Sequence, residues 1–228
     1  GRNDVAERVR QLYVQGPGDF DGAPLRVISC HLGGSSSVTG IRNGVAIGTS
    51  MGFSPQIGLP QNNRVGDLDS MAIPYACKML GLTVEEAEAQ LTKESGLLGL
   101  SGVSNDARDV RDAAAAGNAD AQLANDALID SIRHWAGAFF FQMGGVDVIS
   151  FTAGIGENDA TLRAAVCADL QELGVIIDAD ANAAVRGGKE GIISAPDSPI
   201  KVVVIPANEE LVIAREVFRH VAVGDSLS

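Results

Sequence analysis

The sequence predicts an α/β protein built on a mixed sheet of five strands, and three observations lead to this prediction. Asn43-Gly44 separates two short apolar runs, and because both residues tolerate positive φ the pair indicates an antiparallel hairpin. Strands alternate with helices over the last third of the chain, as in parallel sheets whose strands are joined by crossover helices. Helical patterns fill the middle of the chain, which predicts a helical insertion at about residues 70–143.

Three strands are expected to open the fold. The run 25–30 is short, apolar and rich in β-branched residues, as expected of a buried strand. The runs 37–41 and 45–48 flank the Asn-Gly turn and form the hairpin. Residues 51–69 follow as a loop, because prolines, glycines and asparagines interrupt any period.

Two helix starts carry capping signals. Thr83 precedes Glu85 and Glu86, and acidic residues are favoured in a first turn. Asn118 is expected to open a long helix that ends at about Met143, after a connecting segment 95–109 that is rich in Gly, Ser and Asp. The long helix carries four aromatic residues that would serve either as core or as a contact surface for a second copy of the chain: Trp135, Phe139, Phe140 and Phe141.

The last third of the chain alternates regularly between a strand at 147–152, a helix at 158–173, a strand at 201–205 and a helix at 209–221. With the opening strands this gives the order βββαβαβα, which is that of the ribonuclease-H-like core of sugar kinases, Hsp70 and actin. Residues 25–228 are expected to form this domain. Residues 1–24 read as a leading helix and a turn-rich link.

Composition limits the partners that the chain can have. The 228 residues carry a formal net charge of −12, which disfavours nucleic acid and anionic membrane surfaces. No run of about 18 apolar residues is present in the sequence. The three cysteines lie far apart and show neither metal-ligand nor disulfide spacing, which indicates a reducing, cytoplasmic compartment.

Two glycine-containing turns are candidate phosphate sites. The turn after the first strand contains Gly33, Gly34, Ser35 and Ser36, where backbone amides and hydroxyls can approach an anion; an ordinary β-turn is the alternative. The segment 151–158 follows a parallel strand, where ligands and anions bind in α/β sheets, although a tight turn would look the same. A dinucleotide fingerprint would need a third glycine at position 159, where Asp159 stands, so a mononucleotide site remains.

Three charged segments add further candidates. Arg64 lies in a glycine-containing loop and suits a transferring phosphoryl group, unless it simply pairs with Asp67 or Asp69. The segment 104–109 reads most simply as an N-capped helix start. Glu209 follows the last strand and could hold Mg²⁺, although acidic residues are common in first helical turns.

Taken in order, these segments resemble the acetate kinase family over about residues 25–221. The motifs that carry the resemblance are CHLG at 30–33, TSMGFSP at 49–55, RVGDLD at 64–69, SGLLGLSG at 95–102, Asp106 with Arg108-Asp109, GGVD at 144–147, FTAGIGEN at 151–158 and PANEELVIAR at 206–215.

The resemblance implies ATP-dependent phosphorylation of a short carboxylate, or the reverse reaction, with Mg²⁺ and within a homodimer. It implies that His31 and Arg64 act on the transferring phosphoryl group and that Glu209 reaches the metal. Phosphates would lie against Gly33, Gly34, Ser35 and Ser36. The remaining nucleotide-binding residues implied are Asp106, Ala107, Arg108, Gly154, Ile155, Gly156 and Asn158.

Three departures from the family pattern bear on function. The usual HLGNG reads HLGGS at 31–35, and the usual MGTR reads QNNR at 61–64, which leaves propionate or butyrate open beside acetate. Family members are about twice as long, so the chain is expected to be the C-terminal half, with 1–24 a remnant of the segment before it. A nucleotide-binding or scaffold protein without catalysis is the alternative from another class.

Overall fold

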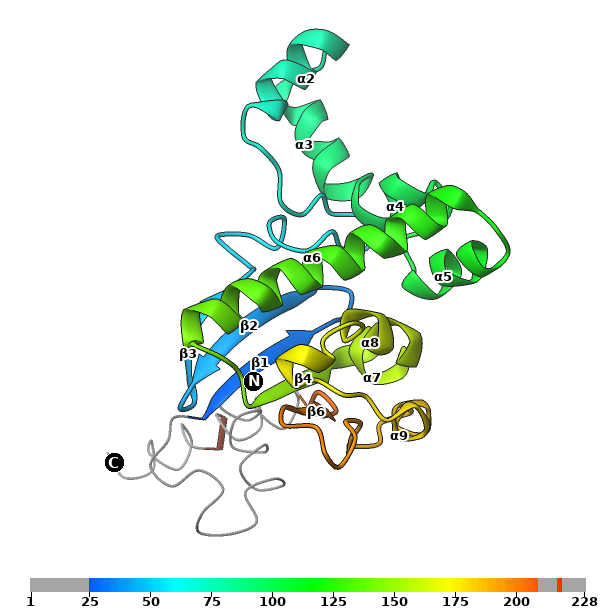
Figure 1. The fold of residues 1–228 in the computed structure, drawn as a ribbon. Helices are drawn as coiled ribbons and strands as arrows, with labels where there is room; N and C mark the ends of the chain where they lie inside the picture. The colour runs from blue at the N-terminus through cyan, green and yellow to red at the C-terminus, as the bar shows by residue number, and fades with distance from the viewer. Residues whose placement is uncertain (1–24, 209–216, 219–228) are drawn as a thin grey trace.

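A six-stranded mixed sheet forms the centre of the molecule in a computed structural model that describes residues 25–208, 217 and 218 (Figure 1). Its strand order is β3-β2-β1-β4-β6-β5. The strands are β1 (Arg26–His31), β2 (Ser37–Arg42), β3 (Val45–Thr49), β4 (Val148–Thr152), β5 (Gly191–Ile192) and β6 (Lys201–Val204). The α/β class and the mixed sheet are therefore confirmed, with one short strand, β5, beyond the five expected.

Pairing in the sheet changes direction at β1. β1 pairs with β2 antiparallel and with β4 parallel, and β4 pairs with β6 parallel. Neighbouring residues of a strand face opposite sides, so Ile28 and Cys30 join the larger core cluster, while Val27 joins a smaller one on the other side. The carboxyl ends of β1, β4 and β6 therefore lie at one edge of the sheet, where ligands bind in folds of this kind.

The hairpin between β2 and β3 forms at the predicted Asn-Gly pair. Asn43 has φ of 53° and Gly44 has φ of 83°, the positive values that a tight hairpin turn requires. The Asn43 side chain also accepts a hydrogen bond from the Leu25 amide at 2.9 Å, which ties the turn to the start of β1.

From residue 25 onward, four short helices precede the long one: α2 (Ala72–Leu80), α3 (Val84–Lys93), α4 (Gly96–Ser101) and α5 (Ala107–Ala115). Thr83 caps α3 as predicted and forms a reciprocal capping box with Glu86. The connecting segment 95–109 holds a helix, α4, that its glycine- and serine-rich composition did not suggest. α2 and α3 project away from the sheet (Figure 1), and no residue of α2 is buried.

The helix α6 (Ala119–Met143) crosses one face of the sheet, and Asn118 caps it as predicted. Phe139 packs directly over Gly40 and Gly48, where a Cβ would clash with its ring. Of the aromatic residues considered as a contact surface, Phe139 is buried and Trp135 and Phe140 pack against the core, while Phe141 is exposed. The aromatic face is thus mostly core.

The helix expected at 158–173 starts close to the predicted residue but is shorter than expected, and a separate short helix precedes it. α7 (Ala153–Asn158) starts directly after β4, α8 (Ala160–Val166) follows, and a 3₁₀ turn, η1, covers Gln171–Leu173. Asp159 separates α7 from α8, because its side chain accepts a hydrogen bond from the Leu162 amide as the N-cap of α8. A further helix, α9 (Ala179–Ala184), precedes β5.

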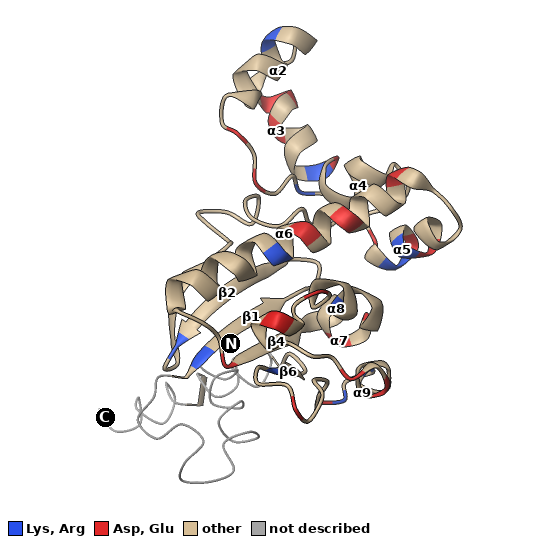
Figure 2. Cartoon of the chain, viewed as in Figure 1, with Lys and Arg blue, Asp and Glu red and all other residues tan. Residues whose placement is uncertain are grey.

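Two predicted segments lie outside the described residues, namely 1–24 and most of the helix expected at 209–221. Within the described part of the chain, none of the helices has the length and hydropathy needed to cross a membrane. Acidic side chains are spread over the outer helices and loops (Figure 2), in keeping with the net charge of −12.

Candidate active site

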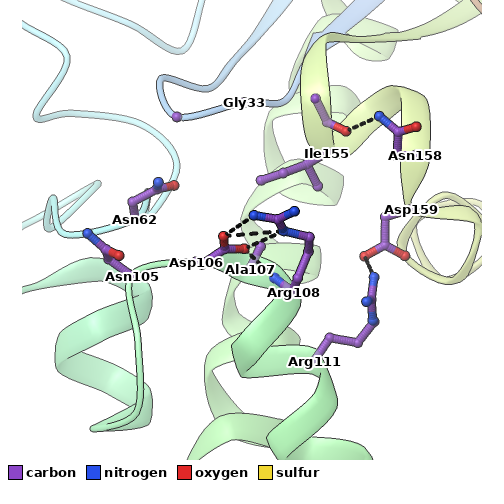
Figure 3. A pocket seen from close by; sticks show the side chains of 12 residues that line it. Gly33, Asn62, Asn105, Asp106, Ala107, Arg108, Arg111, Ile155, Asn158 and Asp159 are labelled. Atoms are coloured by element: carbon purple, nitrogen blue, oxygen red, sulfur yellow. Dashed lines mark hydrogen bonds and ion pairs between the residues drawn. The ribbon is translucent and has the colours of Figure 1, made fainter. Parts of the chain in front are cut away.

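A cavity of about 540 Å³ lies at the carboxyl edge of the sheet (Figure 3). Its volume falls within the range of small-molecule sites. Four segments supply its walls: the turn after β1, the loop before α2, the start of α5, and α7. The lining residues are Gly33, Gly34, Asn62, Asn105, Asp106, Ala107, Arg108, Arg111, Gly154, Ile155, Asn158 and Asp159.

The turn after β1 is held against the start of α7 by backbone hydrogen bonds. The Leu32 amide donates to Thr152 O at 2.9 Å, and Leu32 O accepts from the amides of Ile155 at 2.8 Å and Gly156 at 3.1 Å. Ala153, between these segments, has a positive φ of 66°, and a Cβ at Gly33 would approach its methyl group to 3.3 Å. Close approach of two backbones therefore builds this wall of the cavity.

The wall from α5 carries a charged pair. Asp106 caps the helix by accepting from the Arg108 amide at 2.9 Å, and the Arg108 guanidinium donates to the same carboxylate at 2.6 Å. These hydrogen bonds lower the pKa of Asp106 to about 2, so the carboxylate is charged at neutral pH. Arg108 and Ile155 face the same space in Figure 3, which offers a planar cation and an apolar side chain to one ligand.

Two further contacts close the wall formed by α7. Arg111 reaches from α5 to Asp159 at 3.2 Å, which joins two sides of the cavity (Figure 3). Asn158 donates to Gly154 O at 2.9 Å and accepts from the Gly187 amide at 2.9 Å. Its amide group therefore fixes both α7 and the loop after α9.

Arg64 lies beside the turn after β1 and not in an ion pair with the acidic residues of its own loop. Its Nη1 donates to Ser35 Oγ at 2.7 Å and to Gln61 Oε1 at 3.1 Å. Asp67 instead accepts from Trp135 Nε1 at 3.0 Å and from the Gly58 amide at 3.0 Å. The alternative that Arg64 pairs with Asp67 or Asp69 is therefore wrong.

The structure brings most predicted nucleotide-binding residues to this cavity. Eight line it: Gly33, Gly34, Asp106, Ala107, Arg108, Gly154, Ile155 and Asn158. Ser35 contacts Arg64, and Ser36 exchanges hydrogen bonds with the Gly33 backbone. Gly156 is buried behind the wall, and His31 ends β1 beside Thr152.

Four lining residues were not predicted: Asn62, Asn105, Arg111 and Asp159. Arg111 follows Arg108 by three residues, which on a helix is the same face, so that spacing could have indicated it.

The described residues contain no group of three or more His, Cys, Asp or Glu side chains that could hold a metal ion. The predicted ligand Glu209 lies outside them. The segment that precedes it is anchored, since the Ala207 amide donates to Glu157 Oε1 at 2.9 Å. A Mg²⁺ ion that arrives with a nucleotide takes most of its ligands from phosphate oxygens and water, so it requires few ligands from the protein.

The chain matches the acetokinase family over residues 18–215. It is 49% identical over 195 residues to acetate kinase of Geobacillus kaustophilus, covering 86% of this chain and 49% of that protein. It is 47% identical over 193 residues to acetate kinase of Staphylococcus aureus, covering 85% of this chain and 48% of that protein. The chain thus spans about half the length of these curated relatives.

Solved structures give the same result. Acetate kinase of Porphyromonas gingivalis superposes with a TM-score of 0.86 at 36% identity, over 94% of this chain and 52% of that one. A propionate kinase of Francisella tularensis superposes with a TM-score of 0.82 at 34% identity, again over 94% and 52% of the two chains.

Proposed function

This chain belongs to the acetokinase family, and from that premise we propose that the protein transfers a phosphoryl group between ATP and a short-chain carboxylate. The products are an acyl phosphate and ADP, and the reaction is also expected to run in reverse. The chain supplies the nucleotide side of the reaction site. Its free, widely spaced cysteines favour a cytoplasmic setting.

One observation carries the proposal. The cavity has the position expected of a nucleotide site, at the carboxyl edge of β1 and β4, and Arg64 contacts the same turn whose glycines line it. We place adenine and ribose between α5 and α7, against Asp106, Arg108 and Ile155. The phosphates would then run past Gly33 toward Arg64.

The chemistry requires little from the protein beyond positioning and charge. A carboxylate oxygen attacks the γ-phosphorus, the bond from that phosphorus to the β–γ bridging oxygen breaks, and the bridging oxygen stays with ADP. No proton has to move, because the total charge of carboxylate and ATP equals that of acyl phosphate and ADP. Arg64 neutralises charge that builds up on the equatorial oxygens, and His31 supports the same group.

Magnesium would be held by the nucleotide phosphates together with Glu209, in the role that the family resemblance gives it. When bound, it reduces the negative charge that the incoming carboxylate meets. Glu157 contributes by accepting a hydrogen bond from the Ala207 amide, which holds the segment that leads to Glu209.

The test measures how fast the natural gene product that contains this chain forms acyl phosphate. Hydroxylamine traps the acyl phosphate as it forms. Arg64→Ala is expected to lower turnover by roughly 10³-fold, or about 4 kcal/mol, with little change in nucleotide affinity. Arg64→Lys should recover part of the loss, since an ammonium cannot bind two oxygens in a fixed fork. Unchanged turnover in Arg64→Ala would refute the role given to this arginine.

The acceptor acid and the alternative without catalysis are decided by the same assay. Acetate, propionate and butyrate are compared by kcat/KM, because the departures at 31–35 and 61–64 include His31 and Arg64, the residues to which the proposal assigns the reacting group. Calorimetric binding of ADP with no turnover of any acid would instead favour a nucleotide-binding scaffold.

A homodimer is part of the proposal, and α2 supports it better than α6 does. The exposed apolar residues Met71, Tyr75, Met79 and Leu80 lie on or next to α2, which carries a single charged residue, Lys78 (Figure 2). Helices this short are unstable alone, so a projecting apolar helix favours a partner. Light scattering that gives the monomer mass at tens of micromolar would refute the dimer.

A further inference from the structure

Arg64 is held by a single nitrogen, and its two acceptors come from different loops. Nη1 has two hydrogens, and it donates one hydrogen bond to Ser35 Oγ and one to Gln61 Oε1. Among the described residues, Nε and Nη2 of Arg64 have no hydrogen-bond partner. These two nitrogens form one complete edge of the guanidinium, the edge that can bind two oxygens side by side.

The orientation of the Gln61 amide is fixed by its other contacts. Its Nε2 donates to Ser36 O at 3.2 Å and to Pro55 O at 2.9 Å, and the side chain is 2% exposed. Turning the amide over would place its oxygen against two carbonyl oxygens. Oε1 must therefore point at Arg64.

The backbone that carries Gln61 and Arg64 has separate support. The amides of Leu97, Leu98 and Ser95 donate to the carbonyls of residues 61, 62 and 63 at 2.9–3.1 Å. Gly96 makes this docking possible, since it has a φ of +61° and a Cβ there would overlap Gln61 O. The backbone of residues 61–63 therefore has support that does not depend on the side chain of Gln61.

We propose that Ser35 and Gln61 are positioning residues that hold Arg64 by Nη1, so that its Nε–Nη2 edge is presented to the transferring phosphoryl group. This inference rests on the proposed function. The two residues stand where the chain departs from the family motifs, at HLGGS and QNNR, so the two departures form one unit around one guanidinium. An edge held in advance lowers the entropy that must be lost in the transition state.

The test compares Gln61→Met and Ser35→Ala with a matched control in the same loop. Gln56→Met is that control, because Gln56 is a half-buried glutamine of the same loop whose side chain has no hydrogen bond to Arg64. In the natural gene product, we expect Gln61→Met to lower kcat about tenfold with the KM for ATP changed less than twofold, and Ser35→Ala to lower kcat about threefold. Gln56→Met should leave both within twofold.

A double-mutant cycle separates positioning from a general structural effect. If Gln61 acts through Arg64, adding Gln61→Met to Arg64→Ala should change kcat by less than twofold. A tenfold further loss in that background would overturn the proposal, as would a kcat for Gln61→Met equal to that of Gln56→Met.

An NMR measurement tests whether Gln61 positions Arg64 without relying on turnover. The Nε–Hε signal of Arg64, assigned by its loss in Arg64→Lys, should move or broaden in Gln61→Met and stay in place in Gln56→Met. Absence of kinase activity in the unmodified protein would refute the proposed function. The NMR measurement would still decide whether Gln61 positions Arg64. An Arg64 signal that is identical in Gln61→Met and the unmodified protein would overturn the inference.

Discussion

Replacing Arg163 with methionine is expected to destabilise the chain more than any surface substitution, because this arginine is fully buried and uses every donor that it has. Nε donates to Asn182 Oδ1 at 2.8 Å, Nη1 to Gly156 O at 2.9 Å and Glu157 O at 2.8 Å, and Nη2 to Asn182 O at 2.7 Å and Val185 O at 2.9 Å. These carbonyls stand at the ends of α7 and α9, where helices leave acceptors without partners. One guanidinium therefore caps two helices.

The magnitude follows from what methionine would leave behind. Methionine fills a similar volume but has no hydrogen-bond donor, so five acceptor oxygens would lose their partner. Each hydrogen bond from a charged donor stabilises by about 1.5–3 kcal/mol, but burial of the guanidinium offsets part of this, and burial also lowers its pKa. The balance for a broken buried network is about 3–5 kcal/mol, or on the order of 10 °C in Tm for a chain of this size.

Urea unfolding followed by circular dichroism measures this loss, with the m value as a check that the same surface is exposed. Arg186→Met is the matched control, since Arg186 is exposed and lies in the loop after α9. It should change the free energy of unfolding by less than about 0.5 kcal/mol. A loss below about 1 kcal/mol in Arg163→Met would show that the carbonyls find water or other donors, and the reasoning would fail.

Three further predictions concern other parts of the fold. In the native protein only Cys77 should react rapidly with a thiol reagent at pH 8, because burial raises the pKa of Cys30 and raises that of Cys167 to about 12; two fast thiols would contradict this. Arg108 lowers the pKa of Asp106 from 3.8 to about 2, so its contribution to stability is present above about pH 4 and is lost as the pH falls to 2. Between about pH 4 and pH 2 the free energy of unfolding of Asp106→Asn should therefore fall less steeply than that of the unmodified protein. Identical pH dependences would refute the effect. By urea unfolding, Gly96→Ala should lower the free energy of unfolding by about 2 kcal/mol or more beyond the loss in Gly81→Ala. Both glycines have positive φ, but of the two only position 96 lacks room for a Cβ, so equal losses would refute the steric argument.

Local signals predicted the elements whose causes are local. The Asn43-Gly44 turn, the Thr83 capping box and the Asn118 cap each depend on residues within four positions, and the structure confirms all three. The helix predicted at 158–173 starts near the predicted residue, where Asp159 caps α8, but it ends at Val166. Asp169 has a φ of 58°, which a right-handed helix cannot contain, and the residues around it carry no glycine or proline that would indicate the break. β5 has two residues and exists only because β6 lies beside it.

In the candidate site, too, the sequence predicted the residues whose position follows from local signals and missed those whose position depends on long-range packing. Glycines next to strand ends indicated Gly33 and Gly154, because their position in the chain already places them at the carboxyl edge. The contact between Gln61 and the turn after β1 joins residues 25 positions apart, and no pattern near Gln61 indicates it. Contacts of this kind depend on how α4 positions the loop, which follows from packing and not from sequence spacing.

The parallel pairing of β1 with β4 has a consequence for the order in which the molecule assembles. Arg26 and Asp147, which bond at the start of this pair, are 121 residues apart, and all of α2 to α6 lies between them. Closing so long a loop is slow compared with forming the hairpin or the helices. On the ribosome, β1 emerges long before its central partner does. The turn after β1 and α7 meet only when β4 is in place, so the cavity forms only after β1 and β4 have paired. A nucleotide bound there is therefore expected to slow unfolding while leaving the folding rate almost unchanged.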